Sequence, residues 1–211
     1  MSNSRVQSDD STLLVKCRYF PTSNEKIGTK DFLQASSNAV SLMERFGKVF
    51  TPITNDMREN IIKLTMKYEE DTHSNKYLDD MIIGEQSSGR SSATEALLWL
   101  KRCLHFLSNL FHLIIEENNN GSISNDLAPL LQKAYADTLE PYHGWLGTQL
   151  FTILFRYMPF KKQVFFTLAC DKYDCDESVL TDMKIYNDYL STTVRRLTQF
   201  YVHNGLESLN V

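Results

Sequence analysis

The sequence is poor in the residues that interrupt regular structure and in those that cross-link it. Its 211 residues include only 8 Gly, 5 Pro and 4 Cys, while 42% are apolar. A chain of this length and composition is expected to be a compact globular domain with a sizeable buried core. A basic excess is also missing, since the net charge is −4 and the pI is about 5.7. We therefore expect no nucleic-acid partner.

Several signals for export, anchoring and catalysis are absent. The cysteines show no metal-ligand or redox spacing, which favours a reduced, cytoplasmic protein. No signal peptide, membrane-spanning run or lipidation motif is found, so any membrane contact is expected to be peripheral. The G-x-S-x-G, H-E-x-x-H and P-loop motifs are also missing. We expect a protein that is not an enzyme and needs no cofactor or metal; a hydrolase using His143 with Asp56 is the alternative.

The hydrophobic pattern predicts an all-α protein, because apolar residues recur at helical spacing and strict alternation is not sustained anywhere. Thr29 is expected to cap the first main helix, which Gly47 closes. The most apolar helix is expected to be central and to leave only a narrow polar strip of Lys101, His105, Asn109, His112 and Glu116. That helix is expected to span about 91–117. The other expected helices contain Asp56, or span about 71–83 (ending at Gly84), 125–140 and 142–158, with shorter ones from Lys161 and Glu177.

Three polar side chains stand out on the helix that contains Asp56. Asp56, Asn60 and Lys63 are spaced i, i+4 and i+7, which places them within a stripe roughly 60° wide on a helix. An apolar stripe adjoins them, so the trio is expected beside the core-facing edge. Together with Trp99, from the most apolar helix, these residues predict a binding surface for a polar headgroup.

Each of these residues also has an ordinary structural explanation. Charged helix positions such as Asp56 and Lys63 are most often solvated, and Trp99 could be a core tryptophan. His143 could cap a helix or fill the core. The sequence pattern by itself leaves both interpretations open.

Four sequence blocks together resemble the glycolipid transfer protein family. They are Val49-Phe50-Thr51-Pro52-Ile53-Thr54-Asn55-Asp56, the D-x3-N-x2-K spacing, Leu98-Trp99-Leu100-Lys101-Arg102 and Tyr142-His143-Gly144-Trp145. The resemblance implies a two-layer all-α sandwich of about eight helices that encloses an apolar cavity for lipid chains. It implies a single domain over residues 29–211, preceded by a partly disordered tail and loop over residues 1–28.

The resemblance also implies roles for individual residues. Asp56 and Asn60 would hydrogen-bond the first sugar, Lys63 would add a cationic donor, Trp99 would stack on the sugar ring and His143 would bind the ceramide amide. Candidates for the chain cavity are Phe32, Leu33, Val49, Phe50, Ile53, Phe106, Leu110, Phe151, Phe165 and Leu168. A collapsed core would have the same composition.

Local features bear on which lipid is bound. Glu95 lies one turn before Trp99 and would repel a phosphate, which favours a neutral sugar, although Lys101 and Arg102 follow closely. The chain ends without the aromatic residue that is common near the end of the family's glycolipid binders. A membrane-docking patch, or else an ordinary corner between helices, is expected at Trp145, Tyr157, Phe160, Lys161 and Lys162.

The function that follows is non-vesicular transfer of glycosphingolipids between membranes. The implied partners are a glycosphingolipid ligand and a membrane surface contacted peripherally. Two alternatives remain, a carrier of ceramide-1-phosphate and a lipid sensor or adaptor without bulk transfer activity.

Overall fold

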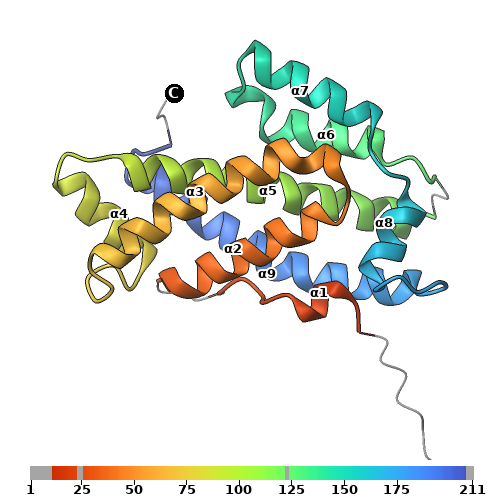
Figure 1. Cartoon of the computed structure of the whole chain (residues 1–211), viewed down its shortest axis with the longest axis horizontal. Helices are drawn as coiled ribbons and strands as arrows, with labels where there is room; N and C mark the ends of the chain where they lie inside the picture. Colours follow the sequence, from red (N-terminus) through yellow and green to blue (C-terminus); the bar gives the residue numbers. More distant parts are fainter. Residues whose placement is uncertain (1–10, 23–25, 122–123, 208–211) are drawn as a thin grey trace, which may run out of the picture.

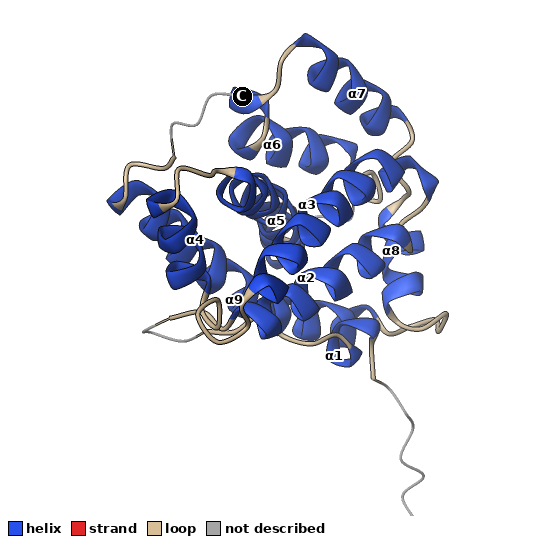
Figure 2. Ribbon diagram, turned by 60° about the vertical axis from the view of Figure 1, so that its left-hand side comes forward, coloured by secondary structure: helices blue, strands red, loops and turns tan. Residues whose placement is uncertain are grey.

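The protein was analysed as a computed structural model that describes residues 11–22, 26–121 and 124–207. Across these ranges the chain forms helices and no strand (Figures 1 and 2), which confirms the expected all-α sandwich. The elements are α1 (Leu13–Lys16), α2 (Thr29–Glu44), η1 (Lys48–Phe50), α3 (Thr51–Glu70), α4 (Leu78–Ser87), α5 (Ser92–Asn119), α6 (Ala128–Thr138), η2 (Glu140–Tyr142), α7 (Trp145–Arg156), α8 (Lys161–Leu168) and α9 (Asp176–His203).

Helix α5 is the centre of the fold. Helices α3, α4, α6 and α9 all pack against it, and α2 packs on the outer side of α3 (Figure 1). Its 28 residues span about 42 Å, and its apolar side chains face neighbours on almost every side. Of the polar strip expected along this helix, His105, His112 and Glu116 are exposed. Lys101 was wrongly placed in that strip, because it is only 3% exposed.

A buried carboxylate holds the N-terminus of α5. Glu85, near the end of α4, is 2% exposed, and its two oxygens accept the backbone N–H groups of Ala93 and Thr94 at 2.9 and 2.7 Å. It also accepts the Thr94 hydroxyl at 2.8 Å. The first N–H groups of a helix have no partner within the helix and carry a partial positive charge, so a carboxylate there is strongly stabilising. The same turn is tied to α9, since the Tyr201 hydroxyl donates to the Thr94 carbonyl at 2.7 Å.

The segment before α2 is partly packed onto the core. Leu14, Phe20 and Ile27 are each at most 1% exposed, although the segment was expected as a tail and loop. Residues 1–10 and 23–25 of that segment lie outside the described part of the chain.

The expected cap of α2 is wrong. Thr29 lies inside the helix and its hydroxyl donates to the Asn75 carbonyl at 2.7 Å, so it tethers α2 to the loop before α4.

Two helix boundaries also differ from the sequence prediction. Residues 71–77, expected to be helical, form turns in which the Asp71 carboxylate accepts the N–H groups of His73 and Ser74. Helix α4 therefore begins later and runs through Gly84, since a glycine can be accommodated inside a helix that is held by packing. Helix α9, expected to be short, has 28 residues and packs against α5 in the opposite direction, with contacts from Thr94 to Phe111 (Figure 1).

We expect Glu85→Ala to reduce the free energy of unfolding by about 2–3 kcal/mol, because two buried N–H groups lose a charged acceptor. Urea unfolding followed by circular dichroism measures this change. Glu69→Ala on the exposed face of α3 is the control, and we expect a change within about 0.5 kcal/mol. Equal urea concentrations at the midpoint of unfolding for the two variants would contradict the assigned role of Glu85.

Candidate functional site

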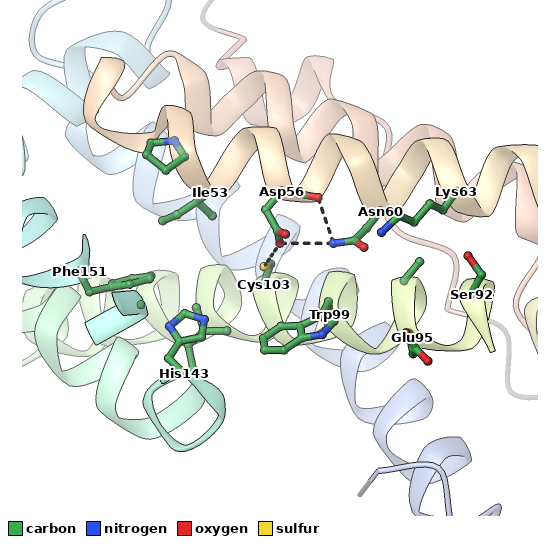
Figure 3. A pocket seen from close by; sticks show the side chains of 14 residues that line it. Ile53, Asp56, Asn60, Lys63, Ser92, Glu95, Trp99, Cys103, His143 and Phe151 are labelled. Carbon is green, nitrogen blue, oxygen red and sulfur yellow. Dashed lines mark hydrogen bonds between the residues drawn. The ribbon is translucent and has the colours of Figure 1, made fainter. Parts of the chain in front are cut away.

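A pocket of about 480 Å³ lies between α3, α5 and the segment that links η2 to α7. It brings together all five residues that the sequence predicts for a headgroup site, although they come from three separate parts of the chain (Figure 3). The lining residues are Pro52, Ile53, Asp56, Asn60, Lys63, Ser92, Glu95, Ala96, Trp99, Cys103, Leu139, His143, Gly147 and Phe151.

The α3 wall of the pocket is polar. Asn60 is 4% exposed, and its amide nitrogen donates to the Asp56 carbonyl at 3.0 Å and to Asp56 Oδ2 at 3.3 Å. Asp56 and Lys63 lie on the same face one turn to either side and point toward α5 (Figure 3). The spacing that the sequence shows therefore places one carboxylate, one carboxamide and one ammonium at the same opening.

The Asp56 carboxylate is less acidic than an ordinary aspartate. Partial loss of hydration raises its pKa, and the Glu59 carboxylate raises it further. Lys63 and the Cys103 thiol, which lies 3.9 Å from Asp56 Oδ2, act in the opposite direction. A hydrogen-bond donor supplied by a ligand would help to satisfy this poorly hydrated oxygen pair.

The opposite wall is aromatic. The rings of Trp99 and His143 are nearly parallel, with centroids 6.0 Å apart and an interplanar angle of 23°. Behind them, Tyr135 stacks on Phe151 at 3.9 Å, and the Tyr135 hydroxyl lies 3.3 Å from His143 Nδ1. Burial lowers the pKa of His143, and the nearby Arg102 guanidinium lowers it further, which favours the neutral imidazole, a form with one nitrogen as an acceptor.

Gly147 makes room for His143, and sequence reasoning missed it. A Cβ at position 147 would lie 2.9 Å from both Cβ and Cγ of His143, which is closer than real Cβ atoms approach. The backbone of α7 therefore packs directly on the imidazole. A glycine one helical turn after a candidate site histidine, inside an otherwise apolar helix, is the sequence signal for such a contact.

Two other lining residues were also not expected at the site. Cys103 and Ser92 lie on the same face of α5 as Trp99, four residues after it and seven before it, so helical spacing from Trp99 could have identified them. Cys103 is 5% exposed, and burial raises the pKa of its thiol strongly, with the Asp56 charge as the second cause. It is a neutral neighbour of Asp56 and not a nucleophile.

The charges around the pocket are unevenly distributed. Asp56 and Glu95 both line it, with Lys63 as a cation, whereas Lys101 and Arg102 are not among its lining residues. Lys101 Nζ donates to the Glu207 carboxylate at 2.5 Å. The charged residues that line the pocket are thus two carboxylates and one lysine, and the Arg102 guanidinium lies behind Trp99.

The residues expected to line a chain cavity lie in the interior. Ile53 and Phe151 form the apolar floor of the pocket and continue into the core. Val49 is partly buried against that core. Seven others are fully integrated into it, namely Phe32, Leu33, Phe50, Phe106, Leu110, Phe165 and Leu168.

The residues expected to dock on a membrane are not all at the surface. Tyr157 and Phe160 are 70% and 60% exposed, and Lys162 is exposed too. Lys161 departs from the expectation, since it is buried and its ammonium donates to Asn118 Oδ1 at 3.3 Å. Trp145 begins α7, but its side chain lies outside the described part of the chain. None of the described helices combines the length and apolar character that crossing a bilayer requires.

The chemistry of this arrangement is that of recognition. A polar edge on α3 faces an aromatic wall from Trp99 and His143, so a flat ligand with hydroxyls on its rim and C–H groups on its face would meet a partner on each side. Within residues 11–22, 26–121 and 124–207, no group of three or more His, Cys, Asp or Glu side chains is arranged to hold a metal ion.

Known proteins are similar to this chain in sequence and in fold. Human pleckstrin homology domain-containing family A member 8 is 31% identical over 192 residues, which is 86% of this chain and 36% of that protein. The chain thus spans about a third of the length of this relative. The structure of FAPP2, which selects simple glycosphingolipids using the GLTP fold, is 26% identical, with a TM-score of 0.79 over 97% of this chain and 98% of that one. Mouse ceramide-1-phosphate transfer protein has the same fold, with a TM-score of 0.81 at 18% identity over 95% of this chain and 100% of that one.

The family model described as "Glycolipid transfer protein (GLTP)" matches residues 27–170, which is more than half of the chain and includes all five residues of the predicted headgroup site. The match, the fold and the pocket together show that the chain belongs to the glycolipid transfer protein family.

Proposed function

We propose that this protein transfers glycosphingolipids between membranes without vesicles, holding the sugar and amide at the pocket and the hydrocarbon chains in the interior. The observation that carries the proposal is the pairing of the polar edge of Asp56, Asn60 and Lys63 with the aromatic wall of Trp99 and His143 in one pocket of about 480 Å³. A sugar has a rim of hydroxyls and an apolar face, and this pocket offers a partner to each.

The charge of the pocket supports a neutral sugar as the headgroup. Glu95 joins Asp56 at the opening, and a phosphomonoester placed there would be repelled by both carboxylates. FAPP2, with its simple glycosphingolipid ligands, is also the relative of known structure with the higher sequence identity of the two compared, 26% against 18%.

The expected chain-lining residues suggest where the hydrocarbon goes. Ile53 and Phe151 connect the headgroup pocket with the apolar core, so chains entering beside the sugar would meet them first. Removing each CH₂ from water is worth about 0.8 kcal/mol, and roughly 30 methylenes oppose spontaneous exit of a sphingolipid by on the order of 20 kcal/mol. An apolar interior offered at the membrane surface lowers this barrier without breaking a covalent bond, so no nucleotide, metal or catalytic step is needed.

We further propose that the protein meets the membrane peripherally and works in the cytoplasm. Tyr157 and Phe160 project from the end of α7 and the loop before α8, and Lys162 lies beside them. Exposed aromatic residues next to a lysine suit the headgroup region of a bilayer. Because Lys161 is buried, we leave it out of this docking surface. Trp145 remains a candidate for it.

Two other functions compete with this proposal. A carrier of ceramide-1-phosphate is favoured by the fold shared with the mouse protein and by the presence of Lys63 at the pocket. A lipid sensor or adaptor would use the same pocket, and only partner capture that depends on bound lipid separates it from a carrier.

Vesicle-to-vesicle transfer of labelled lipids tests the assigned function directly. We expect wild-type protein to move monoglycosylceramide at least about tenfold faster than ceramide-1-phosphate, because each loss of about 1.4 kcal/mol in headgroup binding is tenfold. Trp99→Ala and Asp56→Val should each slow glycolipid transfer by at least about tenfold through loss of the ring platform and of the carboxylate. Faster transfer of the phosphate lipid would favour the alternative carrier, and no transfer of either lipid would refute the proposal.

Gly147→Ala should impair lipid transfer while the fold stays intact. The new methyl group meets the His143 side chain at 2.9 Å and displaces it from Trp99, so we expect transfer to fall by about three- to tenfold. Gly84→Ala in α4 is the matched control, because its methyl group meets nothing within 4 Å. That control should melt slightly higher than wild type, since alanine favours a helix, and transfer normally. Normal transfer by Gly147→Ala would show that the position of His143 is unimportant.

The pH dependence of transfer should report on Asp56. The pKa of Asp56 is raised, so on acidification this carboxylate takes up a proton at a higher pH than an ordinary aspartate and ceases to accept from sugar hydroxyls. Transfer between neutral vesicles should therefore fall as the pH is lowered from about 7 to about 4. His143 also becomes protonated on acidification, so a substitution is needed to separate the two groups.

Glu59→Gln separates the effect of Asp56 from that of His143, because it removes the negative charge that helps to raise the pKa of Asp56. The acid limb of the transfer profile should move to lower pH in this variant. Glu69→Gln, with the same charge change ten residues further along α3, should leave the limb in place. An identical shift in both variants would assign the effect to net charge and not to Asp56.

A further inference from the structure

The chain turns back on itself after α9 and returns to α5. Helix α9 ends at His203, and Gly205 has a φ of +68°, a conformation that glycine adopts without strain. The Leu206 N–H then donates to the Tyr201 carbonyl at 2.8 Å, which closes the turn. The turn places Glu207 against two consecutive residues of α5, Lys101 and Arg102.

Lys101 is buried together with its charge partner. Its side chain is 4% exposed, and its ammonium donates to the Glu207 carboxylate at 2.5 Å and lies 5.1 Å from the centre of the Tyr201 ring. Burial lowers the pKa of Lys101, and the Glu207 charge opposes that shift. A buried ammonium without a counter-charge would be costly, so Glu207 is what allows Lys101 to remain charged in this position.

Arg102 links the same turn to the headgroup pocket. One of its terminal nitrogens donates to the Glu207 carbonyl at 3.3 Å. Its guanidinium carbon lies 3.7 Å from the centre of the Tyr142 ring and 4.9 Å from that of Trp99. Arg102 is 5% exposed, and its Nε finds no hydrogen-bond partner among the described residues. The guanidinium is thus held by two aromatic rings and one carbonyl, with little else to fix it.

One of the two rings that hold Arg102, Trp99, lines the pocket, and the other, Tyr142, directly precedes the lining residue His143. Trp99 is the predicted sugar platform, and Tyr142 immediately precedes His143, whose ring lies parallel to Trp99. A shift of Arg102 would therefore reach both sides of the aromatic wall. The Glu207 carboxylate fixes the turn after α9 on Lys101, and the Glu207 backbone carbonyl accepts from Arg102, which packs against Trp99.

We propose that Glu207 is a positioning residue for the headgroup pocket, acting through Lys101 and Arg102 to hold Trp99 and the segment Tyr142–His143 in their binding arrangement. Glu207 does not touch the ligand in this assignment, and it is absent from the pocket lining. This inference deepens the proposed function. Its test by lipid transfer rests on that function, whereas its test by the fluorescence of Trp99 does not.

The first experiment measures Trp99 in the absence of lipid. The chain has two tryptophans, so Trp145→Phe leaves Trp99 as the sole indole fluorophore. In that background we expect Glu207→Ala to increase acrylamide quenching of Trp99 by about twofold, because the turn loses its ion pair with Lys101 and its backbone carbonyl then holds Arg102, the cation–π partner of Trp99, less firmly. Glu207→Asp should restore part of the wild-type value, since it keeps the charge on a shorter side chain.

The second experiment measures transfer in chains that retain Trp145. Glu207→Ala should slow transfer of monoglycosylceramide by about three- to tenfold, with partial recovery in Glu207→Asp. Glu177→Gln is the matched control for loss of one negative charge, because Glu177 lies in the first turn of α9, at the end opposite Glu207. It should change neither quenching nor transfer. Circular dichroism confirms that each variant is folded, and Glu207→Gln, which keeps an oxygen acceptor for Lys101, replaces Glu207→Ala if the latter unfolds.

The outcomes separate this inference from the proposed function. Unchanged quenching of Trp99 in a folded Glu207 variant overturns the positioning role, whatever the rate of lipid transfer in that variant. Increased quenching with unchanged transfer overturns it as well, because the wall would then move without consequence for the ligand. If wild-type protein transfers no lipid although Trp99 responds to Glu207, the proposed function fails while the link from Glu207 to the pocket wall stands.

Discussion

The structure depends on how the N-terminus of the central helix is satisfied. Helix α5 is packed among other helices, and Ala93 and Thr94 of its first turn are buried, so their N–H groups would be costly without a partner. Glu85 supplies that partner from α4, and Tyr201 secures the same turn from α9. Three helices are thereby fixed at one point. Trp99 lies just over one turn further along α5, so this junction also fixes the position of Trp99 in the pocket.

Loss of hydration shapes the chemistry of the pocket more than any single ion pair. It raises the pKa of Asp56 and lowers that of His143 in the pocket, and it lowers that of Lys101 behind it, so in each case the charged form is disfavoured. Neighbouring charges then adjust each group, with Glu207 supporting Lys101 and Lys63 supporting Asp56. A ligand bound at such a site has to replace the lost hydration with hydrogen bonds, and the sugar headgroup that we propose would do so with its hydroxyls.

The aromatic wall shows how a binding surface can be built from the hydrophobic core. Phe106, Phe151 and Tyr135 form a continuous series of ring contacts, edge-to-face and stacked, from the interior to His143, and Trp99 packs on His143 at the pocket. Because these rings pack on one another, the position of each depends on its neighbours. Two further residues pack against this wall. Gly147 leaves space for the His143 ring, and Arg102 packs against the Trp99 ring. The ligand surface is therefore only the outer layer of a packed arrangement.

The sequence by itself determined the all-α fold class, the central position of the most apolar helix and the shared face of Asp56, Asn60 and Lys63. All three follow from helical periodicity, which is a local property of the chain. That Trp99 and His143 belong to the same site was indicated by family resemblance alone. The tertiary structure decided what periodicity cannot express: the burial of Lys101, the tether of Thr29, the close contact of Gly147 with His143, and the cap supplied by Glu85. Each of these depends on a partner from a different element, or on the exact approach of one backbone to a ring. Such contacts are set by how whole helices pack, so a local pattern can at most mark a candidate residue, as the glycine spacing does for Gly147, and cannot identify its partner.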